Sequence, residues 1–480
     1  MVSPVPGTAP TGPGGAPTGS ISPAAPASLT IPRLVVAAPA SGHGKTTVAT
    51  GIIKALTERG FTVAPFKVGP DYIDPGYHAL AAGRPGRNLD PYMVGTDRVA
   101  PLFAHGAEGA DLAVVEGVMG LYDGATGEGE LASTAQVAKL LDAPVLFVVD
   151  AAAQGRSIAA LVHGFRSYDP EVRLAGVVLN RVGSETHHRI LSEALDEIGV
   201  PVLGALRRDA EVSAPSRHLG LVPVAERRTE ALDAVAALGA LVDTSIRLDE
   251  VYGLARTAPP LRAAPWDPAV EVGPRRGAKA RIAIASGPAF TFSYAENAEL
   301  LTAAGAELCP FDPLRDEALP AGVGGVVIGG GFPEVHAPEL AANEALREAM
   351  FRFARYGGAV AAECAGLLYL GKSLDGLPMC GIVDAEAVMT DRLTLGYRHA
   401  VAASESVLAA AGTRVSGHEF HRTAVSPSAG SPPAWHWRRD GGPVTEGFAG
   451  ARIHASYLHL HWAGTPSIAR RLVESCGVRP

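Results

Sequence analysis

The feature that most constrains the fold of this sequence is a glycine-rich turn between a strand-like run and a helix-like run. The stretch VVAAPASGHGKTTVATGIIKAL starts with β-branched and small apolar residues, breaks at Pro39, and resumes with a helical pattern after Lys45. A Gly-x-Gly-Lys-Thr-Thr turn in that position lets backbone N–H groups point inward, and the lysine and the helix N-terminus add positive charge. The turn therefore predicts a phosphate-binding loop at the end of a buried strand.

We expect this loop to bind a nucleotide together with Mg²⁺, with the Thr46 hydroxyl as a metal ligand. The residues expected to contact the nucleotide or its metal are Ser41, Gly42, His43, Gly44, Lys45, Thr46 and Thr47. The match to the strict P-loop pattern is incomplete, because Pro39 stands where a glycine is usual. Ala40 stands where nucleotide-switch ATPases carry a second lysine, which favours a synthetase over a switch.

Length and composition indicate a globular protein with two or three domains. A chain of 480 residues is too long for one core, and 47% hydrophobic with 19% charged residues is ordinary for such proteins. The net charge of −8 and the lack of a long basic block argue against a nucleic-acid partner. No apolar run is long enough for a bilayer and no signal pattern opens the chain, so we expect a cytoplasmic protein without membrane contact.

Two proline-rich segments divide the chain. Residues 1–30 are rich in Pro, Ala and Gly and are expected to form a disordered tail, while residues 255–280 read as a linker. Elsewhere, short apolar strands alternate with helical patterns, which is typical of parallel α/β sheets. We therefore expect two doubly wound α/β domains, at 31–254 and 281–478, with functional residues at the carboxyl ends of strands.

Charged residues follow a strand end in PFKVGPDYIDPGYH. Lys67, Asp71 and Asp74 could neutralise phosphate, hold Mg²⁺ or orient a substrate. An Asp-x-x-Asp in a Pro/Gly turn often serves only the turn itself. The P-loop earlier in the same half makes the functional reading the better one.

Three further strand-end or loop residues belong to this half. Glu116 ends the apolar run LAVVE and takes the place of a Walker-B acid at a Mg²⁺ site. Asp123, on the next loop, could face the substrate, and Asn180 at the end of VVLN could read the adenine edge. The alternative for Glu116 is a solvated carboxylate at a strand end.

The second half contains a candidate nucleophile. In GGAVAAECAGLLYLG a small apolar strand runs into Cys364 and then into a helix, the layout of a nucleophile elbow in which the helix dipole favours the thiolate. The other cysteines, Cys309, Cys380 and Cys476, are scattered without metal or disulfide spacing. Gly330 and Gly331, in VVIGGGF, could turn backbone N–H groups toward an oxyanion.

The base for this cysteine is sought in RIHASYLHLHW. His459 and His461 have i, i+2 spacing and would share one face of a strand, and His454 lies further off. A metal pair would need a third ligand, which the neighbouring sequence does not offer. A Cys–His dyad fits better, and the residues alone leave the choice between the histidines open.

Together these segments resemble one known family. The segments are APASGHGKTT, FKVGPDYIDPGYH, VVEGVMGLYDG, GGGFPE, AECAGLLYL, GHEFH and ASYLHLHW. Over residues 32–475 the chain resembles the cobyrinic acid a,c-diamide synthases, including their hydrogenobyrinic acid variant. The resemblance implies an N-terminal P-loop domain like dethiobiotin synthetase and a C-terminal class I glutamine amidotransferase domain.

The resemblance also implies roles in the amidotransferase half. Cys364 becomes the glutaminase nucleophile and His459 its base, with His461 as the nearest competitor. Many amidotransferase triads carry an acid two residues after the histidine, and here that position holds His461. The family commonly works with the Cys–His dyad.

For the synthetase half the resemblance implies that Lys45 and Thr46 bind ATP and Mg²⁺, with Glu116 completing the metal site. Asp71 and Asp74 match positions of the ligase step. The implied reaction amidates the a- and c-acetate carboxylates of cobyrinic or hydrogenobyrinic acid in cobalamin biosynthesis, through an acyl phosphate and ammonia from glutamine. The implied partners are a corrinoid, glutamine and ATP, and a homodimer is compatible with the sequence.

Two other functions fit parts of the pattern. A cobyric acid synthase amidates other side chains of the same macrocycle, and PDYIDPGYH and GHEFH favour the a,c enzymes over it. A nucleotide switch with a non-catalytic glutaminase-like half is disfavoured by Ala40 and by the intact Cys364 and His459. Whether the substrate carries cobalt, the order of the amidations, the oligomeric state, the ammonia route and the role of the tail stay open.

Overall fold

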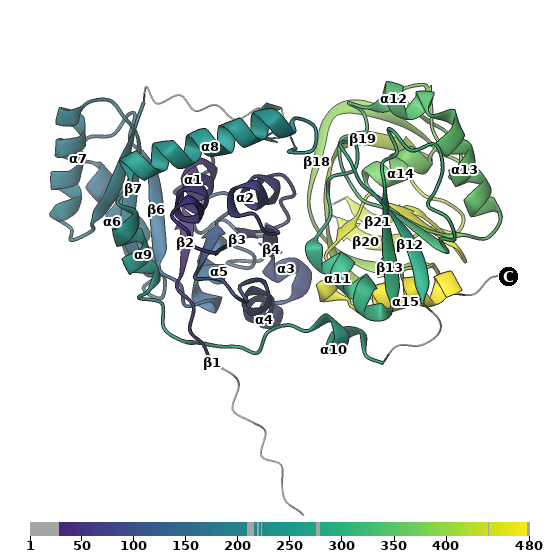
Figure 1. The fold of residues 1–480 in the computed structure, drawn as a ribbon, viewed down its shortest axis with the longest axis horizontal. Coiled ribbons are helices and arrows are strands. Elements are labelled where there is room, and N and C mark those ends of the chain that lie inside the picture. Colours follow the sequence, from purple (N-terminus) through teal and green to yellow (C-terminus); the bar gives the residue numbers. More distant parts are fainter. Residues whose placement is uncertain are drawn as a thin grey trace, which may run out of the picture.

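A seven-stranded parallel sheet forms the centre of the N-terminal half of the computed structural model (Figure 1). Its strand order is β4-β3-β5-β2-β6-β7-β8, and all neighbouring strands are parallel. The strands are β2 Arg33–Ala37, β3 Val63–Val68, β4 Arg87–Leu89, β5 Leu112–Glu116, β6 Val145–Asp150, β7 Leu174–Val182 and β8 Val202–Arg207. The structure describes residues 28–208, 216–217, 220–221, 223–274, 279–439 and 441–477.

Helices cover both faces of this sheet, because successive strand side chains alternate between two apolar layers. Leu34 and Val36 pack into one layer, and Val35 and Ala37 into the other. The first layer holds α1 Lys45–Glu58, α2 Asp74–Ala82, α8 Arg228–Ser245 and α9 Leu248–Ala255. The second layer holds α4 Thr96–Gly106, α5 Thr134–Leu140, α6 Ile158–Tyr168 and α7 Glu185–Asp196.

The C-terminal half is built around a six-stranded sheet of order β13-β12-β14-β15-β23-β22, parallel except for β22. Its strands are β12 Ala280–Ala285, β13 Ala306–Phe311, β14 Gly325–Ile328, β15 Ala359–Glu363, β22 Phe448–Gly450 and β23 Ile453–Ser456. One apolar layer includes α11 Ala295–Ala304 and α15 Ser467–Gly477, and the other α12 Ala337–Ala342, α13 Glu344–Arg355 and α14 Ala365–Leu370. The predicted α/β fold of both halves is confirmed.

A second, mainly antiparallel sheet in this half was not predicted. It follows the order β17-β16-β18-β19-β24, with β20 and β21 branching from β18. Its strands are β16 Ser373–Leu374, β17 Leu377–Pro378, β18 Glu386–Ala402, β19 Arg414–Ser426, β20 Trp435–Arg439, β21 Gly442–Glu446 and β24 His459–Leu460. The long β18 is only partly buried and mixes polar with apolar residues, so it lacks the apolar runs that identified the parallel strands.

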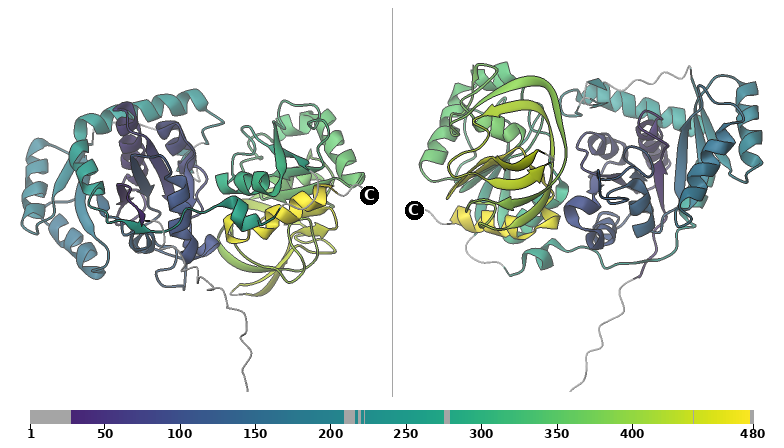
Figure 2. Two further views of the ribbon diagram at one scale, coloured as in Figure 1. Left: turned by 60° about the horizontal axis from the view of Figure 1, so that its bottom comes forward. Right: turned by 180° about the vertical axis from the view of Figure 1, so that it is seen from behind.

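The two halves lie side by side in all three views (Figures 1 and 2). Polar and aromatic contacts join them directly. Arg87 Nη1 donates to Glu296 Oε1 of α11 at 2.6 Å. The Tyr397 hydroxyl of β18 donates to Asp90 Oδ2 at 2.9 Å, and Tyr92 of α3 (Pro91–Val94) stacks on the Tyr397 ring with 4.2 Å between centroids.

The proline-rich segments contain ordered structure. Of the expected tail at 1–30, residues 1–27 lie outside the described residues, and β1 Ser28–Leu29 pairs with β11 Leu261–Arg262. The expected linker at 255–280 contains β11 and α10 Pro268–Val272, and its Trp266 is buried against His105. Among the described helices, none is both long and apolar enough to cross a membrane.

A buried arginine ties the first strand of the N-terminal sheet to this connecting segment. Arg33 is fully buried at the start of β2. Its guanidinium donates to the carbonyls of Leu141 at 2.6 Å, Ile31 at 3.2 Å and Pro259 at 2.6 Å. Because burial lowers the pKa of Arg33 only to about 10, the side chain stays charged at neutral pH.

Replacing this arginine should destabilise the N-terminal half. In Arg33→Met, the carbonyls of Leu141, Ile31, Pro259 and, at 3.5 Å, Asp142 lose a charged donor, and we expect a loss of about 3 kcal/mol in the free energy of unfolding. That corresponds to a fall of roughly 6–12 °C in the melting temperature of the N-terminal half, measured by calorimetry. Arg173→Met, which removes a partly exposed arginine bonded to the Thr257 and Asp142 carbonyls, is the control and should change little. Equal melting temperatures for the two variants would contradict the assignment.

Candidate active sites

The P-loop connects β2 to α1, as predicted. Gly42 and Gly44 have φ angles of +83° and +97°, which side-chain-bearing residues rarely adopt. At Gly44 a Cβ atom would also lie 2.2 Å from Asn180 Nδ2, so only glycine fits. The Lys45 ammonium donates hydrogen bonds to the carbonyls of Ala40 and Met119. Burial, with repulsion from Lys67, lowers the pKa of Lys45 to about 8.

Two predicted nucleotide residues fix this loop to neighbouring strands: Asn180 reaches it from β7, and His43 bonds from the loop to the end of β6. Asn180 Nδ2 donates to the His43 carbonyl at 2.9 Å, and Asn180 Oδ1 accepts from the Arg181 N–H. His43 Nδ1 in turn accepts from the Asp150 N–H at 2.9 Å. The Asn180 amide that was expected at an adenine edge is therefore engaged with the loop backbone. Ser41 is exposed and Thr47 half-buried on the same loop.

A buried charge cluster lies at the carboxyl ends of β3 and β5. Lys67 Nζ is 2.7 Å from Asp74 Oδ2 and 2.8 Å from Glu116 Oε1, with Asp71 Oδ2 at 3.8 Å. The Thr46 hydroxyl joins it, donating to Glu116 at 2.6 Å, with Asp74 at 3.3 Å. The structure thus brings together five predicted residues, from α1, β3, α2, β5 and the loop between β3 and α2.

Opposite charges decide the titration of this cluster. Burial alone would lower the pKa of Lys67, but Asp74 and Glu116 raise it above its ordinary value. Burial alone would raise the pKa of Glu116, and Lys67 holds it below the usual range instead. For Asp74, burial and repulsion from Asp71 raise the pKa well above the ordinary value.

One cluster member was missed by sequence reasoning, and one predicted residue lies apart. His78 is fully buried in α2, with its Nε2 2.7 Å from Glu116 Oε2. Its position four residues after Asp74, one helical turn on, was the available signal.

Asp123 is exposed, and its Oδ2 accepts from the Gly120 N–H at 2.8 Å within its own loop.

Cys364 occupies a strained turn between β15 and α14. Its φ of 50° and ψ of −103° fall in a region that non-glycine residues rarely adopt, as in a nucleophile elbow. Its N–H donates to the Ser456 carbonyl at 2.7 Å, and its Sγ lies 3.8 Å from the Phe420 carbonyl. Burial, followed by repulsion from Glu334, raises the pKa of the Cys364 thiol. The Ala365 N–H at the start of α14 acts in the opposite direction and lowers the pKa of the thiol, as expected of a helix N-terminus, but burial has the larger effect.

Gly330 and Gly331 follow β14 and run close to other backbone segments. A Cβ at Gly331 would lie 2.1 Å from the Ala289 carbonyl oxygen. A Cβ at Gly330 would lie 2.5 Å from Cε1 of His459, so the predicted oxyanion strand and the predicted base are in contact. The Phe292 N–H donates to the Gly330 carbonyl at 3.1 Å and fixes the strand from the other side.

The two histidines have different surroundings. His459 is fully buried, and neither ring nitrogen has a hydrogen-bond partner among the described residues. Burial, with His418 and His421 nearby, lowers its pKa to about 3, so its imidazole is neutral at physiological pH. His461 stacks on Tyr294 at 4.3 Å, and its Nε2 lies 3.6 Å from Glu296 Oε2.

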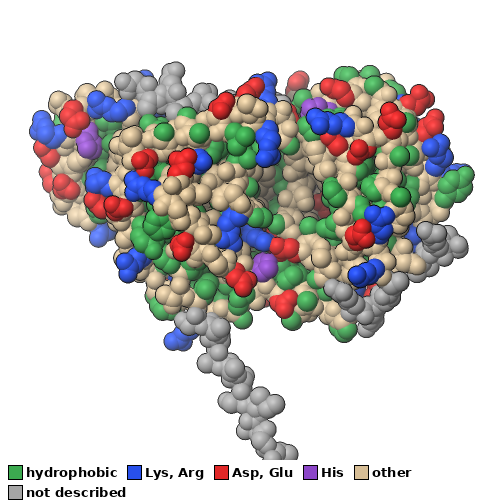
Figure 3. All heavy atoms as spheres, in the orientation of Figure 1, with side chains coloured by type: hydrophobic (Ala, Val, Ile, Leu, Met, Phe, Trp, Pro, Cys, Tyr) green, Lys and Arg blue, Asp and Glu red, His purple; other side chains and the backbone are tan. Residues whose placement is uncertain are grey.

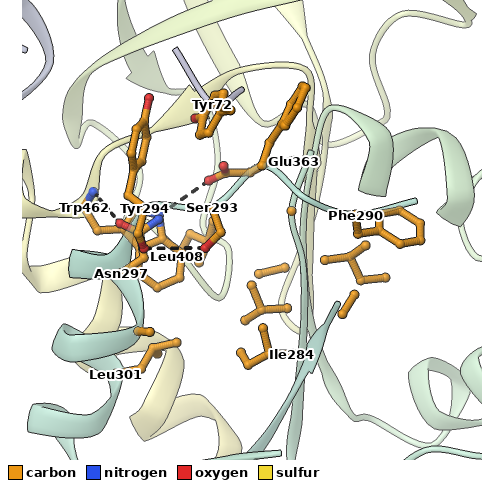
Figure 4. A pocket seen from close by; sticks show the side chains of 17 residues that line it. Tyr72, Ile284, Phe290, Ser293, Tyr294, Asn297, Leu301, Glu363, Leu408 and Trp462 are labelled. Carbon is orange, nitrogen blue, oxygen red and sulfur yellow. Dashed lines mark hydrogen bonds between the residues drawn. The ribbon is translucent and has the colours of Figure 1, made fainter. Parts of the chain in front are cut away.

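A pocket lies beside the elbow, under the carboxyl ends of β12, β14 and β15 (Figure 4). Glu363, which precedes Cys364, lines it, and burial raises the pKa of this carboxyl to about 8. Trp462 Nε1 approaches Glu363 Oε1 at 3.4 Å. Tyr72 of the N-terminal half also lines the pocket, and Figure 3 shows the surface hollowed between the halves.

Two family models match the two halves separately. Residues 34–222 match the CobQ/CobB/MinD/ParA nucleotide binding domain, and residues 281–467 match the CobB/CobQ-like glutamine amidotransferase domain. A hydrogenobyrinate a,c-diamide synthase from Streptomyces coelicolor is 62% identical over 475 residues, covering 93% of this chain and 98% of the relative. The chain belongs to the a,c-diamide synthase family.

Two other relatives support this membership of the a,c-diamide synthase family. A hydrogenobyrinate a,c-diamide synthase from Mycobacterium bovis is 53% identical, with 93% of this chain and 98% of the relative covered. A cobyrinate a,c-diamide synthase from Dehalococcoides mccartyi is 40% identical with the same two coverages. The predicted family is confirmed, and the P-loop cluster and the cysteine elbow each fall inside one matched domain.

The contact between Gly330 and His459 generates a prediction for the amidotransferase domain. In Gly330→Ala the added methyl group must displace the His459 ring, and a shift of about 1 Å at a catalytic group can cost roughly 100-fold in rate. We expect glutamine hydrolysis, followed as glutamate release, to fall on that scale. Gly450→Ala, where a Cβ meets open space, is the control and should retain the activity. Unchanged hydrolysis in Gly330→Ala would show that the contact does not matter.

Proposed function

We propose that this protein is an ATP- and glutamine-dependent ligase that amidates the a- and c-acetate carboxylates of a corrinoid acid in cobalamin biosynthesis. The observation that carries the proposal is the pairing, in one chain, of a P-loop charge cluster with a second domain that holds a strained cysteine elbow and a buried histidine in contact with a glycine strand. Of the relatives described above, those at 62% and 53% identity are named for hydrogenobyrinate and the one at 40% for cobyrinate. We therefore propose the metal-free hydrogenobyrinic acid as the preferred substrate.

In the synthetase half, a substrate carboxylate attacks the γ-phosphorus of ATP, forming an acyl phosphate as the bond to ADP breaks. Lys45 neutralises phosphate charge once ATP draws its ammonium away from the loop carbonyls. Ammonia then attacks the acyl carbon, phosphate leaves, and a proton is lost. The Lys67 ammonium, in the same charge cluster, attracts the substrate carboxylate, and Asp71 helps to place that ammonium at 3.8 Å.

The residues around Thr46 fit a magnesium ion. The Thr46 hydroxyl oxygen lies 2.6 Å from Glu116 Oε1 and 3.3 Å from Asp74 Oδ2. All three are hard oxygen donors, the ligands that Mg²⁺ prefers. No group of three His, Cys, Asp or Glu gathers at metal-binding spacing in the described part of the chain, so the hydroxyl and phosphate oxygens have to complete the set. When bound, Mg²⁺ supplies charge neutralisation on the transferred phosphoryl group.

In the amidotransferase half, the Cys364 Sγ attacks the glutamine carboxamide carbon. His459 takes the thiol proton and returns it to the leaving ammonia, and water then hydrolyses the thioester to glutamate. N–H groups near Gly330 and Gly331 stabilise the oxyanion. Because burial raises the pKa of the thiol and lowers that of the imidazole, both are neutral at rest, and proton transfer awaits glutamine.

The division into two sites is tested with two nitrogen sources. Cys364→Ala should lose amidation with glutamine but keep amidation with ammonium chloride, because the synthetase half needs only an amine. Amidated corrinoid is measured by mass spectrometry, with hydrogenobyrinic and cobyrinic acids as parallel substrates.

Lys45→Ala is the opposite control for this experiment. It should fail with either nitrogen source, since losing one phosphate contact commonly costs orders of magnitude in rate. If Cys364→Ala is inactive with ammonium as well, the two-site division is wrong, and near-normal turnover of Lys45→Ala would reject the P-loop role.

The choice of base is tested by comparing the histidines. His459→Asn should slow alkylation of Cys364 by a glutamine-analogue reagent at least tenfold near neutral pH, because the buried thiol then lacks a proton acceptor. His461→Asn should be milder, because its ring faces Tyr294 and Glu296. The alkylation rate of Cys364 is measured against pH in each variant. If only His461→Asn slows the alkylation, His461 is the base instead of His459.

A further inference from the structure

Tyr72 belongs to the loop that carries the synthetase carboxylates. It stands between Asp71 and Asp74, and Asp71 Oδ1 accepts from the N–H groups of Ile73 at 2.8 Å and Asp74 at 3.2 Å. Asn88 Nδ2 holds the same loop by donating to the Gly69 and Asp71 carbonyls. The backbone of Tyr72 is therefore fixed by the groups that surround Lys67.

The Tyr72 side chain leaves its own half and enters the other one. Its ring stacks on Phe292 at 5.0 Å with 9° between the planes, and lies 4.7 Å from the Tyr294 ring and 5.1 Å from the His459 ring. Figure 4 shows it at the end of the pocket, near Tyr294 and Glu363. Phe292 is the residue whose N–H holds Gly330, so Tyr72 touches both the base and the support of the oxyanion strand.

The His459 ring depends on packing for its orientation. A catalytic histidine is commonly oriented by a hydrogen bond from its second ring nitrogen to an acid or a carbonyl. Neither His459 nitrogen has such a partner within the described residues. The ring packs against Gly330 on one side and the aromatic rings of Tyr72 and Phe292, with His418 and His421 also nearby.

Two strong polar links between the halves lie on other side chains than the His459 ring. Arg87 reaches Glu296 and Glu299 on α11, and Asp90 reaches Tyr397 on β18. These contacts fix the relative placement of the halves. Tyr72 instead runs from the carboxylate loop to the base of the glutaminase.

We infer that Tyr72 is a positioning residue that makes glutamine hydrolysis depend on the synthetase site: its ring holds His459 against Gly330 when loop 69–74 is engaged by nucleotide and substrate. The inference rests on the function proposed above and adds a residue to it. When nucleotide and substrate bind at the carboxylates, they stabilise one position of loop 69–74, and through Tyr72 they also stabilise the matching position of His459. Because such coupling is reciprocal, glutamine bound at His459 must in turn favour binding at the synthetase site. Glutamine is then hydrolysed when an acyl phosphate can accept the ammonia.

The test compares Tyr72→Ala with Tyr72→Phe in the full-length protein. Glutamate release from glutamine is measured with and without ATP plus hydrogenobyrinic acid, and amidation with ammonium chloride is measured separately. In the wild type and in Tyr72→Phe, which keeps the ring, we expect ATP and substrate to stimulate glutamate release at least tenfold. In Tyr72→Ala we expect less than twofold stimulation, with ammonium-dependent amidation within about threefold of the wild type.

The matched control is Tyr252→Ala, which removes a tyrosine of the same half whose ring packs at a tilt against Phe61 at 4.9 Å, away from both sites. It should keep the stimulation. Full stimulation in Tyr72→Ala, or equal losses with glutamine and ammonium, would overturn the inference, because the second pattern means that Tyr72 serves only the synthetase site.

A second measurement separates this inference from the proposed function. Cys364 alkylation by a glutamine analogue is timed with and without ATP, which requires no corrinoid turnover. Acceleration by ATP in the wild type and its loss in Tyr72→Ala support coupling, and equal rates in both proteins contradict it. Failure of the wild type to amidate any corrinoid with ammonium would count against the proposed function alone.

Discussion

Both sites depend on the ion pairs that the buried Lys67 ammonium makes with two carboxylates. The ammonium lies between Asp74 and Glu116, two carboxylates that burial alone would disfavour as charged groups. Removing one partner from such a group leaves an uncompensated buried charge and typically costs about 3–5 kcal/mol. Lys67 thereby keeps the Thr46 hydroxyl, the end of β5 and the start of α2 in one place, and with them the loop that bears Tyr72.

The two sites use opposite electrostatic designs. The synthetase cluster is charged, with ammonium groups and carboxylates shifting one another's pKa, as phosphate chemistry requires. The amidotransferase site is neutral at rest, because burial disfavours both the Cys364 thiolate and the protonated His459. A neutral thiol is a weak nucleophile, so the proposed reaction requires a proton acceptor to reach the Cys364 thiol before it attacks glutamine.

The contacts between the two halves also connect the surroundings of the two sites. Arg87 extends from β4 to Glu296, and Glu296 is also 3.6 Å from His461. His461 is thus connected to the interface rather than to the cysteine, although it is only two residues from His459. The position where many amidotransferases carry an acid has here become part of the contact between domains.

The sequence by itself determined the parts whose chemistry is local. The P-loop, the Cys364 elbow and the parallel strands were predictable because each depends on a turn geometry or on apolar periodicity within a few residues. The carboxylate cluster was predictable as a set because parallel strand ends meet at one edge of a sheet. Only the tertiary structure decided that the Cys364 thiol is buried, that Asn180 braces the P-loop, and that Tyr72 reaches the other half. Those outcomes depend on desolvation and on contacts between residues far apart in the chain, and neither is written in a local pattern.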